Sequence, residues 1–146
     1  MKFTMIIDKT KDEEILATVH APSELTEKIR QLVQEYTGTD RVAAFLDDDI
    51  TMLSFDKIAC ISVIDGKTYA VDSKGKRYRL KQRLYELEQM LPAYFIRINK
   101  SAIANEQLIE RFAANFSGAV DAVFRGGYRE YVSRRCFAQI KRRYHL

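Results

Sequence analysis

The sequence predicts a mainly β protein that also carries helices, an α+β fold. Short runs rich in β-branched and aromatic residues follow one another from Arg41 onward, and turn signals separate them at roughly 8–12-residue spacing. Helical periodicity is confined to a few segments beside these runs. The 146 residues, 47% of them hydrophobic, suit one domain with a real core and leave room for a small appended unit.

The first part of the chain predicts a strand–strand–helix unit. We place it at residues 1–42, as an extension of a domain at residues 43–146. The runs Phe3–Asp8 and Glu14–His20 have the composition of short strands. Ser23 is the predicted N-cap of the helix that follows, and Gly38 is its predicted closing residue. Apolar residues recur along this helix at Leu25, Ile29, Leu32, Val33 and Tyr36.

Five strands are predicted next, at residues 42–46, 50–55, 58–64, 68–72 and 77–80. The predicted turns between them are Asp47-Asp48-Asp49, the hairpin signal Asp65-Gly66, and residues 73–76. A helix is predicted over residues 80–91, ended by Pro92. Its apolar face consists of Leu80, Leu84, Leu87 and Leu91.

The last part returns to strands and ends in a helix. The predicted strands are residues 95–98, 108–116, 119–124 and 128–132, and Gly126-Gly127 is the turn of the final hairpin. Ser133 caps the predicted helix over residues 134–146. Phe137, Ile140 and Tyr144 are expected on its buried side.

Several classes of function are disfavoured by what the sequence lacks. No apolar run reaches the roughly 18–20 residues of a membrane helix, and the N-terminus does not resemble a signal peptide, so a cytoplasmic location is expected. Cys60 and Cys136 are expected to be buried thiols rather than a disulfide. The three adjacent aspartates favour a solvated turn, and His20 and His145 lie near opposite ends of the chain. We therefore expect no metal, no cofactor and no catalytic site.

Charge is unevenly distributed along the chain. Residues 1–50 hold 11 acidic and 6 basic side chains, a net of −5, whereas residues 51–146 hold 9 acidic and 18 basic ones, a net of +9. The basic residues gather in three clusters: Lys74, Lys76, Arg77 and Arg79; Arg97 and Lys100 with Asn99 and Ser101; and Ser133, Arg134 and Arg135, followed by Lys141, Arg142 and Arg143. All lie at predicted connections or element ends, where binding residues are common, so they suit either an anionic partner or an ordinary solvated surface.

Three segments carry a family resemblance, at residues 58–71, 84–112 and 126–144. Their order and spacing resemble the LytTR DNA-binding domain of bacterial transcription regulators. The residues that match the family pattern are Leu84 and Leu87 in a helix, Phe95 and Arg97 in a strand, Lys100-Ser101, Ile103 and Asn105, and Ser133-Arg134 before the last helix. The resemblance covers about residues 45–146, and the residues before it are too few for a receiver domain.

The resemblance implies an elongated arrangement of small antiparallel β-sheets whose loops enter successive major grooves of DNA. Lys100 would hold one base-reading position, and Arg134 or Arg135 the other. Asn99 stands where many family members have His. The DNA-contacting residues implied in this way are Ser73, Lys74, Arg97, Asn99, Lys100, Ser101, Arg134 and Arg135. Ile96, Ile98 and Ile103 would anchor the loop that carries Lys100 in the core.

The resemblance also implies partners: double-stranded promoter DNA with paired direct repeats, a homodimer on that DNA, and the small membrane protein that inhibits some relatives with short N-terminal extensions. The predicted function is a sequence-specific transcription regulator without enzymatic activity. Two other classes stay open. One is a protein-interaction module whose acidic N-terminal unit docks a partner. The other is an RNA-binding domain, although such domains usually present exposed aromatic side chains.

Overall fold

The structure is a computed structural model that describes residues 1–37 and 40–146, so Gly38, the predicted end of the first helix, lies outside the described residues. Helices and strands follow in the order α1 (Glu24–Thr37), β1 (Arg41–Leu46), β2 (Asp49–Ser54), η1 (Phe55–Lys57), β3 (Ile58–Ile64), β4 (Lys67–Asp72), β5 (Arg77–Leu80), α2 (Leu84–Met90), β6 (Phe95–Asn99), β7 (Ala102–Asn105), η2 (Glu106–Leu108), β8 (Ile109–Ala114), β9 (Val120–Phe124), β10 (Arg129–Val132) and α3 (Arg134–Arg143). Among them, no helix is long and apolar enough to cross a membrane.

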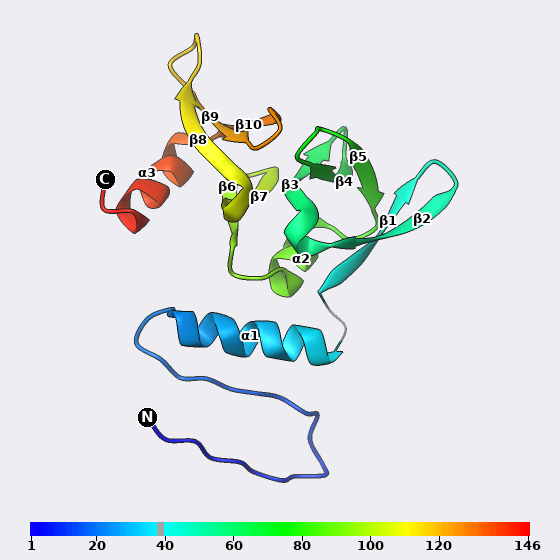
Figure 1. Ribbon diagram of the computed structural model, residues 1–146, viewed down its shortest axis with the longest axis vertical. Coiled ribbons are helices and arrows are strands. Elements are labelled where there is room, and N and C mark those ends of the chain that lie inside the picture. Colours follow the sequence, from blue (N-terminus) through cyan, green and yellow to red (C-terminus); the bar gives the residue numbers. More distant parts are fainter. Residues whose placement is uncertain (38–39) are drawn as a thin grey trace.

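The strands form two antiparallel sheets, which confirms the mainly β, α+β fold. The larger sheet has seven strands in the order β2-β1-β5-β4-β3-β7-β6, and the smaller has three in the order β10-β9-β8. The smaller sheet and α3 lie together on one side of the molecule, while the β1–β2 hairpin lies at the far edge of the larger sheet (Figure 1). The two sheets are joined through β6 and β10, which pack against each other.

Tight turns connect most neighbouring strands where the sequence predicts them. Asp65 and Gly66 both have positive φ, 51° and 74°, which suits the short β3–β4 hairpin. The sequence did not predict β7, which pairs with both β3 and β6. Its four residues are all buried, so it lacks the alternation that identifies a half-exposed strand. The polar break at Lys100-Ser101 is therefore the turn of a β6–β7 hairpin.

The predicted strands Phe3–Asp8 and Glu14–His20 are wrong for the described chain, because no strand forms before β1. A strand needs a neighbour that pairs its backbone N–H and C=O groups, and these two segments have none in the described chain. Two helix boundaries also differ. Leu80 ends β5, paired with Thr68, so α2 begins only at Leu84. Tyr144, expected on the buried side, follows α3 and is 47% exposed.

The hydrophobic core has two parts, and in the described chain it begins at Val42. One part lies between the larger sheet and α2, where Leu87 packs with Phe55 and Ile58. The other lies between the two sheets and α3, with Phe124, Ile98, Ile140 and Cys60 among its members. None of the described residues of helix α1 belongs to either part.

Helix α1 faces the β domain with a mixed side, on which the apolar residues Ile29 and Val33 are half-buried beside polar ones. Glu27, Gln31 and Gln34 line an open cavity together with Phe55 and Tyr94. The side-chain amide of Gln34 donates a hydrogen bond to the carbonyl of Met90 at 3.4 Å. Partial burial, with the nearby carboxylates of Asp56, Glu27 and Asp40, raises the pKa of Tyr94 to about 12. Leu25 and Leu32 point away and are 43% and 64% exposed.

Candidate nucleic-acid interface

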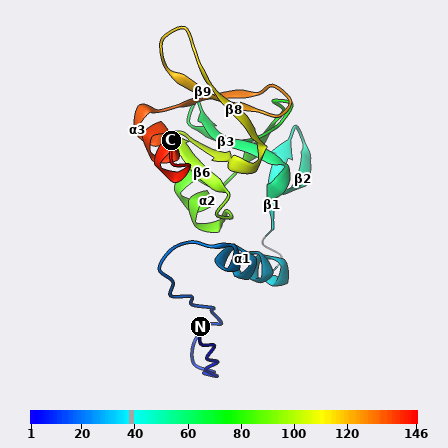
Figure 2. The same ribbon diagram turned by 60° about the vertical axis from the view of Figure 1, so that its left-hand side comes forward.

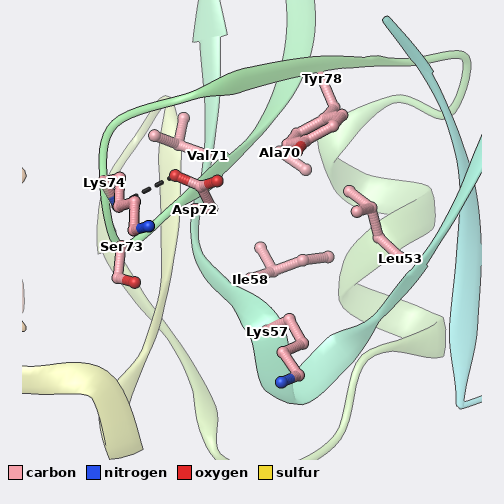
Figure 3. Close-up of a pocket in the computed structure, with 9 residues that line it drawn as sticks. All are labelled: Leu53, Lys57, Ile58, Ala70, Val71, Asp72, Ser73, Lys74 and Tyr78. Carbon is pink, nitrogen blue, oxygen red and sulfur yellow. Dashed lines mark hydrogen bonds between the residues drawn. The ribbon is translucent and has the colours of Figure 1, made fainter. Parts of the chain in front are cut away.

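The β4–β5 turn presents Lys74 to solvent from a fixed backbone. Oδ1 of Asp72 accepts hydrogen bonds from the backbone N–H groups of Lys74 and Lys76, both at 2.9 Å. The carbonyl of Asp72 accepts a third from Gly75 at 3.0 Å. Figure 3 shows the first of these bonds and the residues that line a cavity beside the turn. This cavity has a volume of about 250 Å³ and is lined mainly by apolar residues such as Ile58 and Tyr78. Because Asp72 fixes the turn, the Lys74 side chain starts from a defined point.

The β9–β10 turn supports the β4–β5 turn from the second sheet. Gly126, at φ +97°, lies so close to Ser73 that an added Cβ would be 2.2 Å from the Ser73 carbonyl oxygen. Tyr128 lies beside Gly75, and its hydroxyl donates a 2.6 Å hydrogen bond to Glu130. Burial, reinforced by this bond, raises the pKa of Tyr128 well above the ordinary tyrosine value. The sequence predicted a turn at Gly126 but gave no sign of this contact.

The β6–β7 turn is organised by Asn99. This residue is only 7% exposed, and its side-chain amide donates a hydrogen bond to the carbonyl of Tyr131 at 2.7 Å. Its side-chain oxygen accepts from the backbone N–H of Ser101, also at 2.7 Å. The carbonyl of Ser101 in turn accepts from Val63 at 2.8 Å. Lys100, between these two braced residues, is exposed.

Arg97 joins α2 to the same turn. Its guanidinium lies 2.8 Å from the carboxylate of Glu88 and donates a 2.9 Å hydrogen bond to the carbonyl of Lys100. An ion pair this exposed adds little stability. Its value is geometric, because it fixes the peptide that carries Lys100. Both contacts of the Arg97 guanidinium are therefore with other groups of the protein, whereas Lys100 is exposed.

The start of α3 lies directly beside the β6–β7 turn. Ser133 donates its backbone N–H to the carbonyl of Ile98 at 2.8 Å, and its hydroxyl accepts from Cys136 at 3.2 Å, which confirms it as the N-cap. Arg134 and Arg135 follow in the first turn and are exposed. Two cations at the positive end of a helix are unfavourable for the helix itself. A bound phosphate would remove that penalty.

The β4–β5 turn, the β6–β7 turn and the start of α3 all lie next to the ends of strand β10. The β4–β5 turn lies at its N-terminal end through Gly126, and the β6–β7 turn and α3 start lie at its C-terminal end through Tyr131 and Ser133. At about 3.3 Å per residue, the first and last residues of β10 lie roughly 10 Å apart. The structure therefore brings the second and third predicted loops together and sets the first at the other end of the same strand.

Three other cations of the basic clusters have partners within the protein. Lys76 lies over the ring of Tyr78 at 5.4 Å, and Lys141 lies over the ring of Phe137 at 5.2 Å. Arg143 is paired with Glu106 at 3.0 Å. Partial burial raises the pKa of Glu106, and Arg143 opposes that rise. Among the predicted site residues, Lys74, Lys100, Arg134 and Arg135 are the exposed cations.

Exposed cations on braced turns of a β-rich domain are suited to an anionic ligand such as a nucleic acid. The chain belongs to the LytTr DNA-binding domain family, whose model matches residues 48–145. It is similar to uncharacterized HTH-type transcriptional regulators of Staphylococcus aureus, from strains MSSA476 and MW2. Each is 30% identical over 146 residues, covering 98% of this chain and 97% of the relative.

The fold is also that of a solved structure. The LytTr DNA-binding domain of a Bacillus cereus response regulator matches with a TM-score of 0.65 and 23% identity, covering 73% of this chain and 98% of that one. No helix-turn-helix occurs in residues 1–37 and 40–146, although the Staphylococcus relatives carry that term in their names. Strands follow α1 and α2, and a strand precedes α3.

Proposed function

We propose that this protein is a transcription regulator that reads specific sites in duplex DNA with loop residues. The observation that carries the proposal is that exposed cations lie on turns whose backbone is held by hydrogen bonds. The main example is Lys100, which lies between Asn99 and Ser101. An exposed Lys or Arg on a rigid support can meet base edges as well as phosphates. Cations on flexible surface segments favour phosphate alone.

The eight predicted site residues take two roles in this proposal. Lys74, Lys100, Arg134 and Arg135 contact the DNA, with Lys100 and Arg135 at base edges. The other four, Ser73, Arg97, Asn99 and Ser101, act mainly by positioning them. For Asn99 this follows from its burial and from the two backbone groups that its amide already contacts.

We further propose that two copies occupy paired direct repeats in a promoter as a homodimer, and that the protein works in the cytoplasm without catalytic activity. Residues 1–42 form an N-terminal extension, and residues 43–146 form the DNA-binding domain. A small membrane protein is a candidate inhibitor, and it would act through the extension. Binding to random duplex, random single strands and a promoter pool separates duplex readout from RNA binding and from a pure protein-interaction role.

Affinity for a cognate duplex is expected to fall steeply with salt. If the four exposed cations each displace a counterion, the slope of log K against log salt concentration should be about −3 to −4, since each phosphate contact contributes about −0.9. Titrations at several salt concentrations measure it. Lys74→Ala removes one such contact and should therefore make the slope shallower by about 0.9. A slope near zero would contradict electrostatic contact through these loops.

Removing residues 1–40 is expected to leave a folded, DNA-binding remainder. The core begins at Val42, and the removed part holds 8 acidic and 5 basic side chains, so the remainder is more positive. Binding to random duplex should therefore be unchanged or stronger. A thermal melt and a titration with a single-repeat duplex check both points. A remainder that melts cooperatively but no longer binds DNA would show that the extension belongs to the DNA site.

A further inference from the structure

The N-terminal arm, residues 1–22, forms a surface separate from the DNA-binding loops. Its large apolar side chains are exposed: Phe3, Met5, Ile6, Ile7, Ile15, Leu16 and Val19. Helix α1 adds an exposed apolar stripe made of Leu25, Leu32 and Tyr36. The arm and α1 lie at the end of the molecule opposite the three-stranded sheet in both views (Figures 1 and 2). Exposed apolar residues gathered to this extent mark an interaction surface.

The arm has the pattern of strands without a neighbour. In Phe3–Asp8, side chains alternate in direction, so Phe3, Met5 and Ile7 would share one apolar face. The chain turns at Asp8, where Oδ1 accepts from the backbone N–H of Thr10 at 2.9 Å. No ladder forms between the two segments of the described arm. Their backbone groups can be paired by a strand from another chain.

The first segment is complementary to a second copy of itself. In an antiparallel pair centred on Met5, Phe3 of one chain faces Ile7 of the other, and Lys2 faces Asp8. The six apolar side chains of the two chains then share one face, and an opposite-charge pair forms at each end. We propose that two copies of this protein dimerise through their arms in this register, with the apolar stripes of the two α1 helices covering the apolar face.

The exposed apolar surface approaches the size of a stable dimer interface. Phe3, Met5 and Ile7 with the three stripe residues expose on the order of 600 Å² per copy, at about 100 Å² for each large side chain, and the paired backbones bury further surface. A standard interface buries about 800 Å² per partner. A different side of α1 faces its own β domain, so the stripe of Leu25, Leu32 and Tyr36 is exposed for contact with the partner. A lipid surface fits less well, because it cannot pair backbone groups, and Asp12, Glu13 and Glu14 oppose an anionic membrane.

The test is the mass of the full-length protein in solution without DNA, measured by sedimentation at micromolar concentration. Wild type is expected to have the mass of two chains. Met5→Glu places two like charges on the two-fold axis and should weaken dimerisation at least tenfold. Met52→Glu is the matched control, since Met52 is also exposed, at 57%, but lies on β2. It should stay dimeric, and both variants should keep the wild-type melting temperature because neither residue is in the core.

A charge exchange tests the register. Lys2→Glu and Asp8→Lys should each weaken dimerisation, whereas an equimolar mixture of the two variants should restore it as a heterodimer. A wild-type mass of one chain, a dimeric Met5→Glu variant, or a mixture that stays monomeric would overturn the proposal. So would a monomer that binds anionic vesicles through the arm. The proposal stands apart from the DNA-binding role, because these measurements contain no DNA, and Met5→Glu should still bind a single-repeat duplex like wild type.

Discussion

Gly126→Ala is expected to lower the free energy of unfolding by about 3 kcal/mol and to weaken binding to a single-repeat duplex roughly tenfold. The added Cβ would lie 2.2 Å from the carbonyl oxygen of Ser73, so the two turns must separate. The φ of +97° adds strain for any residue with a side chain. Once the β9–β10 turn moves, the neighbouring Lys74 loses its support. Urea unfolding and a DNA titration well below the melting temperature measure the two effects.

Gly127→Ala is the matched control for this experiment. Gly127 has nearly the same φ, +99°, but an added Cβ there meets no atom within 4 Å. Gly127→Ala should lower the free energy of unfolding by about 1–2 kcal/mol through backbone strain and leave DNA affinity nearly unchanged. Equal effects of the two substitutions on DNA binding would mean that backbone strain alone is responsible and that contact with Ser73 does not position the first loop.

Local patterns in the sequence predict most of the β domain because its hairpins are short-range features. Asp65-Gly66 and Gly126-Gly127 allow positive φ, and the alternating runs beside them need only each other to pair. Strand β7 was missed because it is buried throughout and carries no alternation. The N-terminal strands failed for the opposite reason. Their residues favour extended backbone, but pairing depends on a neighbour that residues 1–37 and 40–146 do not provide within one chain.

The site shows a similar division. The positions of the basic clusters could be predicted, because Lys and Arg near predicted turns can be recognised in the sequence. The roles of the other polar residues were not predictable, because their partners are distant in the chain. Asn99 is bonded to Tyr131, and Asn105 donates to the carbonyl of Ile58 at 3.0 Å. An Asn that reads a base and an Asn that braces a turn look the same in sequence. The pairing of Glu88 with Arg97, between α2 and β6, was equally hidden.

Lys100→Ala and Arg135→Ala are each expected to cost about 1–3 kcal/mol of binding free energy on a cognate duplex and less on random DNA. Lys100 projects from a turn that Asn99 and Arg97 fix, and Arg135 from a helix turn that Ser133 caps. Side chains with such fixed origins can meet base edges at constant geometry. Loss of either side chain is therefore expected to reduce the difference in binding free energy between cognate and random DNA. Binding curves on both duplexes, beside a thermal melt, measure this.

Arg142→Ala is the matched control, because Arg142 is an exposed cation near the chain end, in the last turn of α3. Its loss should weaken cognate and random binding by a similar, smaller factor, as expected for a residue that meets phosphate only. All three side chains are exposed, so the free energy of unfolding should change by no more than about 0.5 kcal/mol. If Lys100→Ala and Arg135→Ala lower both affinities equally, these residues hold phosphates, and base readout must come from another part of the loops.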